Sequence, residues 1–131
     1  MKKKDKDSLL AFEMKCYRRI LHIRWQQRIT NVEVRRRVGN SRNIIQRIVE
    51  RKLSLFGHIC RMGDLRLVEC VVFGMMDGKT RRGRPSREWL DDTREWCQMD
   101  IYTLSRMAQD RTQWRETVRR ALDTNGRELM E

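Results

Sequence analysis

Basic side chains spaced by glycines form the segment of this 131-residue chain that points most directly to a chemistry. Between positions 79 and 87 they surround the tetrapeptide Arg82-Gly83-Arg84-Pro85. Guanidinium groups match phosphate oxygens bidentately, and glycines let backbone amides approach a phosphate closely. The segment therefore predicts contact with a nucleic-acid backbone. The predicted contact residues are Lys79, Arg81, Arg82, Arg84 and Arg87.

Two other interpretations of this segment stay open. The same tetrapeptide matches the short core of minor-groove hooks, in which arginines enter narrow A·T tracts. Such hooks usually lie in flexible tails, whereas this segment leads into a stretch that contains Trp89 and Trp96. The third interpretation is a solvated loop that only positions the helix after it.

A second basic surface is predicted from the early part of the chain, where few acidic residues lie close by. Long basic side chains often serve only solubility, so a solvated helix face competes here with phosphate binding. The residues concerned are Arg18, Arg19, Arg24, Arg28, Arg35, Arg36 and Arg37.

The four tryptophans have two interpretations as well. Exposed indoles stack on nucleic-acid bases. At helical spacing beside Leu and Cys, however, tryptophans more often belong to a core. The residues are Trp25, Trp89, Trp96 and Trp114.

Metal binding and nucleophilic catalysis are weakly indicated. His58, Cys60 and Cys70, with His22 or Cys97, supply the ligand types of a zinc site, but without the paired spacing that structural zinc sites use. His58 and Cys60 are two positions apart on a predicted helix and so point to different faces. Buried thiols and a surface histidine are the simpler interpretation, and we predict no metal.

An acidic pair, Asp91-Asp92, has the residue types of a two-metal carboxylate site. It lies within a predicted helix among other charged residues, where a solvated helix face is the simpler interpretation. No phosphate-binding glycine motif of a nucleotide site is present. We therefore expect no catalytic residue, no cofactor and no small-molecule substrate.

The charge distribution supports a polyanionic partner. The chain has 30 Lys and Arg against 18 Asp and Glu, a formal net charge of +12. Residues 1–60 carry 16 basic and five acidic residues, whereas residues 91–131 carry seven and nine. No apolar stretch is long enough to span a bilayer, and no apolar segment follows the basic N-terminus as in a signal peptide. We expect an intracellular protein, nuclear or cytoplasmic and not secreted, without a membrane partner.

The hydrophobic spacing is helical throughout and predicts an all-α fold, a small bundle of five to six helices. A basic Gly/Arg loop or short hairpin is expected near 74–85. We expect residues 1–7 to be a disordered basic tail and residues 123–131 a frayed tail. The helical domain between them, 8–122, would comprise basic helices (8–62), a linker with the basic loop (63–85) and Trp-rich helices (86–122).

Several local features refine this prediction. An apolar stripe on the first helix is expected to form its buried face. Thr30 and Glu33 form a capping-box pattern, and Gly39 is placed to end that helix in the left-handed conformation. Asn40 or Ser41 is expected to cap the third helix and Ser86 the next. The stripe consists of Leu9, Phe12, Cys16, Ile20 and Ile23.

Five segments occur in an order and spacing that together are specific. They are residues 10–21, residues 28–34, residues 51–62 with Phe56-Gly57-His58-Ile59, residues 78–91 with Trp89-Leu90-Asp91, and residues 108–115. This series resembles the C-terminal region of non-LTR (LINE-type) retrotransposon polyproteins, the endonuclease–reverse transcriptases. The resemblance covers about residues 8 to 121.

The resemblance implies a role in holding nucleic acid. The parent polyproteins are RNA-directed DNA polymerases with an endonuclease that perform target-primed reverse transcription. Their polymerase aspartates, in a YADD- or FADD-type motif, are absent from this sequence, as are the endonuclease carboxylate and histidine motifs. No catalytic residue is therefore carried over. The matching region lies downstream of the polymerase, which implies a truncated or degenerate copy, or a partial gene model.

We therefore expect a non-catalytic fragment that holds template RNA or target DNA through phosphate contacts. The alternative is a helical protein-interaction module that packs on a larger partner such as a polymerase domain.

Overall fold

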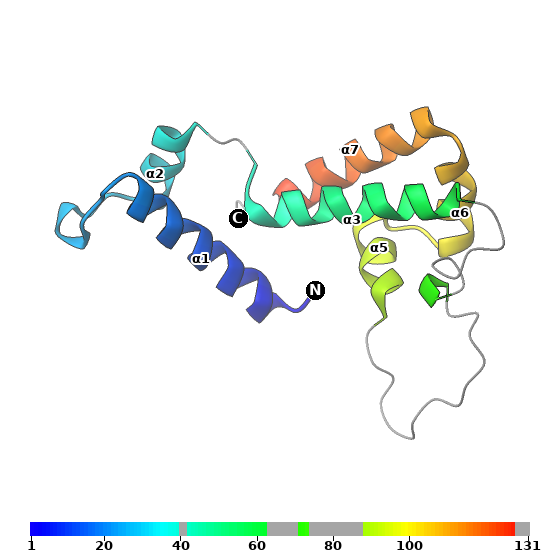
Figure 1. Ribbon diagram of the computed structural model, residues 1–131, viewed down its shortest axis with the longest axis horizontal. Helices are drawn as coiled ribbons and strands as arrows, with labels where there is room; N and C mark the ends of the chain where they lie inside the picture. Colours follow the sequence, from blue (N-terminus) through cyan, green and yellow to red (C-terminus); the bar gives the residue numbers. More distant parts are fainter. Residues whose placement is uncertain (40–41, 63–70, 74–87, 128–131) are drawn as a thin grey trace, which may run out of the picture. The chain divides into compact units, whose positions relative to one another are not determined.

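The computed structural model describes residues 1–39, 42–62, 71–73 and 88–127, and within these ranges it is helical without strands, as predicted. The predicted loop at 74–85 lies outside the described residues. Contacts divide the chain into two compact units, residues 1–48 and residues 49–131. The elements are α1 (Lys3–Ile20), the 3-10 helix η1 (Trp25–Gln27), α2 (Asn31–Val38), α3 (Ile44–Cys60), α5 (Trp89–Cys97), α6 (Ile101–Gln109) and α7 (Arg111–Arg127) (Figure 1).

In the first unit, α2 packs against α1 around Val34 and Met14, which are both buried. Arg18 on α1 holds the start of α2 in place. Its Nη2 donates to the carbonyl oxygen of Ile29 over 2.7 Å, and its Nη1 donates to Oδ1 of Asn31 over 2.8 Å. The turn between α1 and α2 is thus closed by a side chain of α1.

The predicted buried stripe of α1 is not the face that α2 covers. Phe12 and Ile20 of that stripe are 59% and 70% exposed. Helix positions two apart lie on nearly opposite sides, so Met14 and Phe12 face different ways. The prediction was wrong because polar contacts select the docking side: Arg18, four residues after Met14, is the residue that binds the chain entering α2.

In the second unit, the core forms around the indole of Trp114 on α7. Its Nε1 donates to the carbonyl oxygen of Leu53 on α3 over 3.0 Å, and its ring centroid lies 5.4 Å from that of Phe56. In Figure 1, α7 runs alongside α3. Burial of Trp114 and Trp96 confirms the core interpretation for these two tryptophans. The other buried apolar residues of the unit include Leu53, Phe56, Ile59, Leu90, Leu104, Ala108, Val118, Ala121 and Leu122.

The ends of α3 and α6 satisfy each other's carbonyl groups. The last carbonyls of a helix have no partner within it. Arg61, just after α3, donates to the carbonyl oxygen of Ala108, and Gln109 at the end of α6 donates to that of Cys60 over 2.8 Å. This exchange fixes where α6 ends relative to α3.

Helix starts differ from the predictions in several places. The cap of α3 is Asn43, whose Oδ1 accepts from the backbone of Gln46, rather than Asn40 or Ser41. Glu88 rather than Ser86 precedes the first turn of α5. Helix α6 begins after Asp100. The backbone amide of Thr103 donates to both carboxylate oxygens of Asp100, which caps the helix there.

The two chain ends are more helical than predicted. Helix α1 begins at Lys3, so residues 3–7 belong to it and not to a disordered tail. Helix α7 runs to Arg127 and so includes residues 123–127 of the predicted frayed tail. The hydroxyl of Thr124 donates to the carbonyl oxygen of Arg120, a backbone contact compatible with helix. Gly39 ends α2 in the left-handed region, with φ of 68°, as predicted.

Gly57 provides a test of the Trp114 contact. A Cβ at this position would collide with the indole of Trp114. Alanine normally favours a helix over glycine by about 1 kcal/mol. Here we expect Gly57→Ala to destabilise the protein by roughly 1–3 kcal/mol, as overpacking does. Urea denaturation followed by circular dichroism measures this, with Ser54→Ala on the exposed side of α3 as the control. An unchanged or higher midpoint for Gly57→Ala would contradict the packing.

Candidate nucleic-acid interface

The predicted basic residues fall into two groups. Lys79, Arg81, Arg82, Arg84 and Arg87 lie outside the described residues. The seven arginines between positions 18 and 37 all lie in the first unit, on α1, on α2 and in the turn between them. Residues 1–48 hold 14 Lys and Arg against four Asp and Glu, a net charge of +10. The described part of the interface is therefore a property of this unit.

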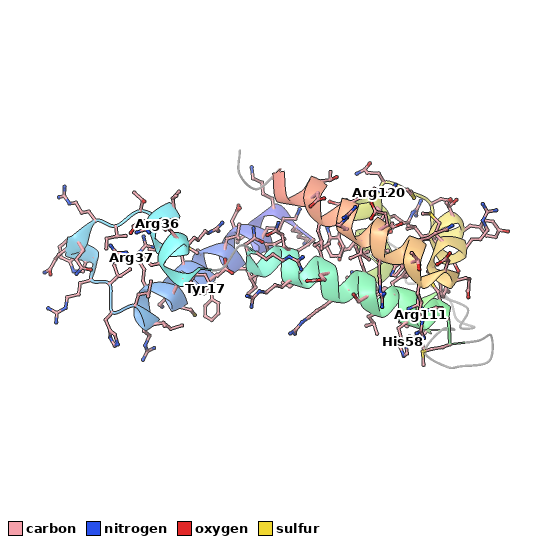
Figure 2. The ribbon with its side chains drawn as sticks, turned by 90° about the horizontal axis from the view of Figure 1, so that it is seen from above. Tyr17, Arg36, Arg37, His58, Arg111 and Arg120 are labelled. Atoms are coloured by element: carbon pink, nitrogen blue, oxygen red, sulfur yellow. The ribbon has the colours of Figure 1, made fainter. Side chains whose placement is uncertain are left out.

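Two of the arginines on α2 are paired within their own helix. Nε of Arg36 donates to Oε2 of Glu33 over 2.7 Å, and Nε of Arg37 donates to Oε1 over 2.8 Å. Both side chains project from α2 in Figure 2. Hydrogen bonds from Arg36 and Arg37 lower the pKa of Glu33 to about 2. The backbone of Glu33 completes half of the predicted capping box by donating to Thr30 Oγ1 over 3.4 Å.

Arg35 faces a buried carboxylate on α1. Its Nη2 lies 3.9 Å from Oε2 of Glu13, which is 6% exposed, and the hydroxyl of Tyr17 donates to Oε1 of Glu13 over 3.1 Å. Among the described residues, Nε of Arg35 and Oε2 of Glu13 have no hydrogen-bond partner. The guanidinium is thus held near Glu13 by charge and keeps an unused donor.

An open cleft of about 630 Å³ lies between α1 and α2. Three of its lining residues are cationic, so the cleft offers hydrogen-bond donors to an anion. The sequence interpretation included two of them and missed Lys15, whose position on the α2-facing side depends on how the helices dock. The lining residues include Leu10, Met14, Lys15 and Arg18 from α1 and Asn31 and Arg35 from α2.

Three arginines of the same unit make no side-chain contact with an acidic residue in the described part of the chain. Arg19, Arg24 and Arg28 are all exposed. Arg24 and Arg28 flank η1, and Arg19 is the penultimate residue of α1. Because no described carboxylate neutralises them, they are the best placed of the seven predicted arginines to meet phosphates.

Trp25 is a candidate functional residue for which helical spacing favours a core position that the structure does not show. The core interpretation fails here, because Trp25 is 85% exposed. The available signal was its neighbourhood: Arg24, Gln26, Gln27 and Arg28 surround it without an apolar residue among them.

The side chains that the sequence offered for carboxylate or thiol chemistry have structural roles in the described part of the chain. Asp91 accepts from the backbone of Glu88 over 2.8 Å at the start of α5, and Asp92 forms an ion pair with Lys52 over 2.6 Å. Burial raises the pKa of the Cys97 thiol to about 11, which keeps it protonated at neutral pH. No cluster of metal-ligating side chains occurs in the ranges that the structure describes. Cys70 lies outside them.

Within the described ranges, every helix is too short or too polar to cross a bilayer.

Comparison with protein-family models, curated proteins and solved structures found no match to this chain.

The pKa of Glu33 gives a way to measure its pairing with Arg36 and Arg37 on α2. Its pKa is lowered from 4.5 to about 2, so its contact with Arg36 and Arg37 is complete above pH 4.5 and is lost as the pH falls through about 2. We expect the carboxyl carbon of Glu33 to titrate in NMR near pH 2 in the parent protein. In the double variant Arg36→Gln, Arg37→Gln the midpoint should return toward 4.5. Equal midpoints in the two proteins would show that the pairing does not persist in solution.

Proposed function

We propose that this protein binds nucleic acid through phosphate contacts made by its first unit, without catalysis of its own. The observation that carries the proposal is the presence of Arg19, Arg24 and Arg28 on the surface of a unit of net charge +10, with no carboxylate paired to them among the described residues. An arginine already paired to a carboxylate must give up that contact to bind a phosphate. A free one only releases or replaces water.

The cleft between α1 and α2 supports the same function. Lys15, Arg18 and Arg35 line it. Arg18 is held by neutral acceptors, the Ile29 carbonyl and the Asn31 amide oxygen, so its positive charge is oriented and not neutralised. A phosphate entering the cleft would meet the Arg18 guanidinium, whose position the fold already sets, and this lowers the entropic cost of binding.

The resemblance to retrotransposon reverse transcriptases adds a biological setting to this proposal. It suggests that the chain corresponds to a region downstream of the polymerase that holds template RNA or target DNA. Lys79, Arg81, Arg82, Arg84 and Arg87 would then make phosphate contacts of their own.

The salt dependence of binding tests the role of the free arginines. For duplex DNA, log K falls against log salt with a slope of about −0.9 per neutralised phosphate. Replacing Arg19, Arg24 and Arg28 by glutamine should make the slope shallower by about 2 to 3. Fluorescence anisotropy of a labelled duplex at several salt concentrations measures it.

The control removes the same charge from the second unit. Arg106, Arg111 and Arg115 are also exposed, and their replacement by glutamine should leave the slope nearly unchanged. If the slope becomes shallower by the same amount in both triple variants, only net charge matters and the assignment to the first unit fails. Replacing Arg81, Arg82 and Arg84 together tests the loop in the same way, and a slope equal to that of the parent would remove the loop from the interface.

A second candidate, protein interaction, is favoured by the exposed stripe of α1. Phe12 and Ile20 are eight residues apart on one side of this helix and are both largely exposed. Apolar residues at such spacing are typical of a helix face that packs on another protein.

The double variant Phe12→Ser, Ile20→Ser separates the two candidate functions. If the stripe serves protein contact, this variant should self-associate less in light scattering while its affinity for duplex DNA stays the same. Lost DNA affinity in a folded variant would instead assign the stripe to the nucleic-acid interface.

A further inference from the structure

We propose that Trp25 is a stacking platform for an unpaired base, so that the preferred ligand of the first unit is a single-stranded nucleic acid. This inference rests on the proposed function and adds to it the class of ligand. It follows from the exposure of one indole, the way its turn is held, and the charges on either side of it.

The exposure of Trp25 is unusual for its residue type. Tryptophan is highly buried on average because its large apolar surface is costly to leave in water. Trp25 is 85% exposed, so both faces of its ring are largely open to a ligand. Folding of the unit therefore does not account for an indole here.

The turn that carries Trp25 is held at both of its ends. After α1, His22 adopts a left-handed conformation, with φ of 52°, and the Ile23 amide donates to the carbonyl oxygen of Arg18 over 2.9 Å. This bond and that from His22 to Arg19 form a Schellman motif without glycine. At the other end, Arg28 is also left-handed, with φ of 46°.

Hydrogen bonds between residues three positions apart complete the turn between His22 and Arg28. The side chain of Gln27 accepts from the backbone of Arg24 over 3.2 Å, and the Arg28 amide donates to the carbonyl oxygen of Trp25 over 3.2 Å. Arg18 binds the chain just beyond, at Ile29. Left-handed non-glycine residues persist only where the surroundings determine them. The indole is thus presented by a defined backbone and not by a free chain end.

The charges around Trp25 match a nucleic-acid strand. Arg24 and Arg28 flank η1 and pair with no carboxylate among the described residues. Aromatic residues beside cations are the combination that single-strand-binding proteins use, because the ring takes the base while the cations take the phosphates next to it. In a duplex both faces of a base are already stacked, and exposing one costs a few kcal/mol. The geometry therefore favours a strand whose bases are unpaired.

The other three tryptophans are engaged in the second unit. Trp114 donates to Leu53 and packs on Phe56. The ring centroids of Trp89 and Trp96 lie 4.7 Å and 5.4 Å from Nζ of Lys52. Trp25 is the tryptophan whose ring is left for a ligand.

The experiment compares Trp25→Ala and Trp25→Phe with the parent, using full-length protein. The probes are 12-nucleotide oligo(dU), oligo(U), an abasic 12-mer with the same phosphates, and a 12-base-pair duplex. We expect Trp25→Ala to weaken binding to oligo(dU) or oligo(U) by about 5- to 150-fold, the effect of losing one stacked base. Trp25→Phe should retain most of the affinity. Binding to the abasic strand should not change.

A spectroscopic readout and a control variant complete the design. Stacking should quench part of the indole emission when oligo(dU) or oligo(U) is added, and this part should be missing in Trp25→Phe. The control is Tyr102→Ala, which removes an aromatic ring that is 80% exposed on α6 and should change none of the affinities. Oligo(U) and oligo(dU) differ only in the 2′-hydroxyl, so the one that shows the larger Trp25 effect identifies the strand as RNA or DNA.

The possible failures are distinguishable. If the parent binds the abasic strand and the duplex with steep salt dependence while Trp25→Ala binds oligo(dU) and oligo(U) unchanged, the stacking proposal is overturned and the proposed function stands. An equal loss on the abasic strand would overturn it as well. If the parent binds no nucleic acid but Trp25 emission shifts to the blue with phosphatidylserine vesicles, both proposals are overturned in favour of a lipid surface.

Discussion

The first unit is organised by the need to neutralise Glu13, a carboxylate that folding removes from water. A buried carboxylate requires a cation and hydrogen-bond donors. Tyr17 supplies a donor from the same helix, and Arg35 supplies the cation from α2. Because Arg35 must face α1, the next residues, Arg36 and Arg37, point elsewhere on α2, where Glu33 binds both. The buried acid and the contacts of Arg18 with Ile29 and Asn31 together orient α2 and set the use of its three arginines.

This arrangement separates the amount of charge from its availability. The composition gives the unit a large positive charge, and every arginine in it contributes equally to that number. The fold divides them: the arginines of α2 face Glu13 or Glu33, whereas Arg19, Arg24 and Arg28 meet no carboxylate among the described residues. A phosphate gains more from the second group, because no existing ion pair has to be broken.

The sequence was informative where a feature depends on neighbours along the chain. Helical spacing predicted the all-α architecture, and Thr30 and Gly39 marked the two ends of α2, since a cap involves residues within one turn. It failed where a feature depends on another element. An apolar stripe tells which residues a partner could bury, but the side of α1 that α2 covers was decided by Arg18 and Glu13, which are polar. The contact predictions for residues 79–87 remain predictions.

The tryptophans show why residue type and spacing do not by themselves separate a core from a binding site. In the second unit, Lys52 lies over Trp89 and Trp96, but Asp92 pairs with its ammonium group, so cation, rings and counter-charge are satisfied together. Trp25 also has cations beside it, yet no described carboxylate pairs with them and no core covers its ring. An aromatic ring and a cation form a closed structural cluster where an acid is present. Where it is missing, they remain open to a ligand that brings its own negative charge.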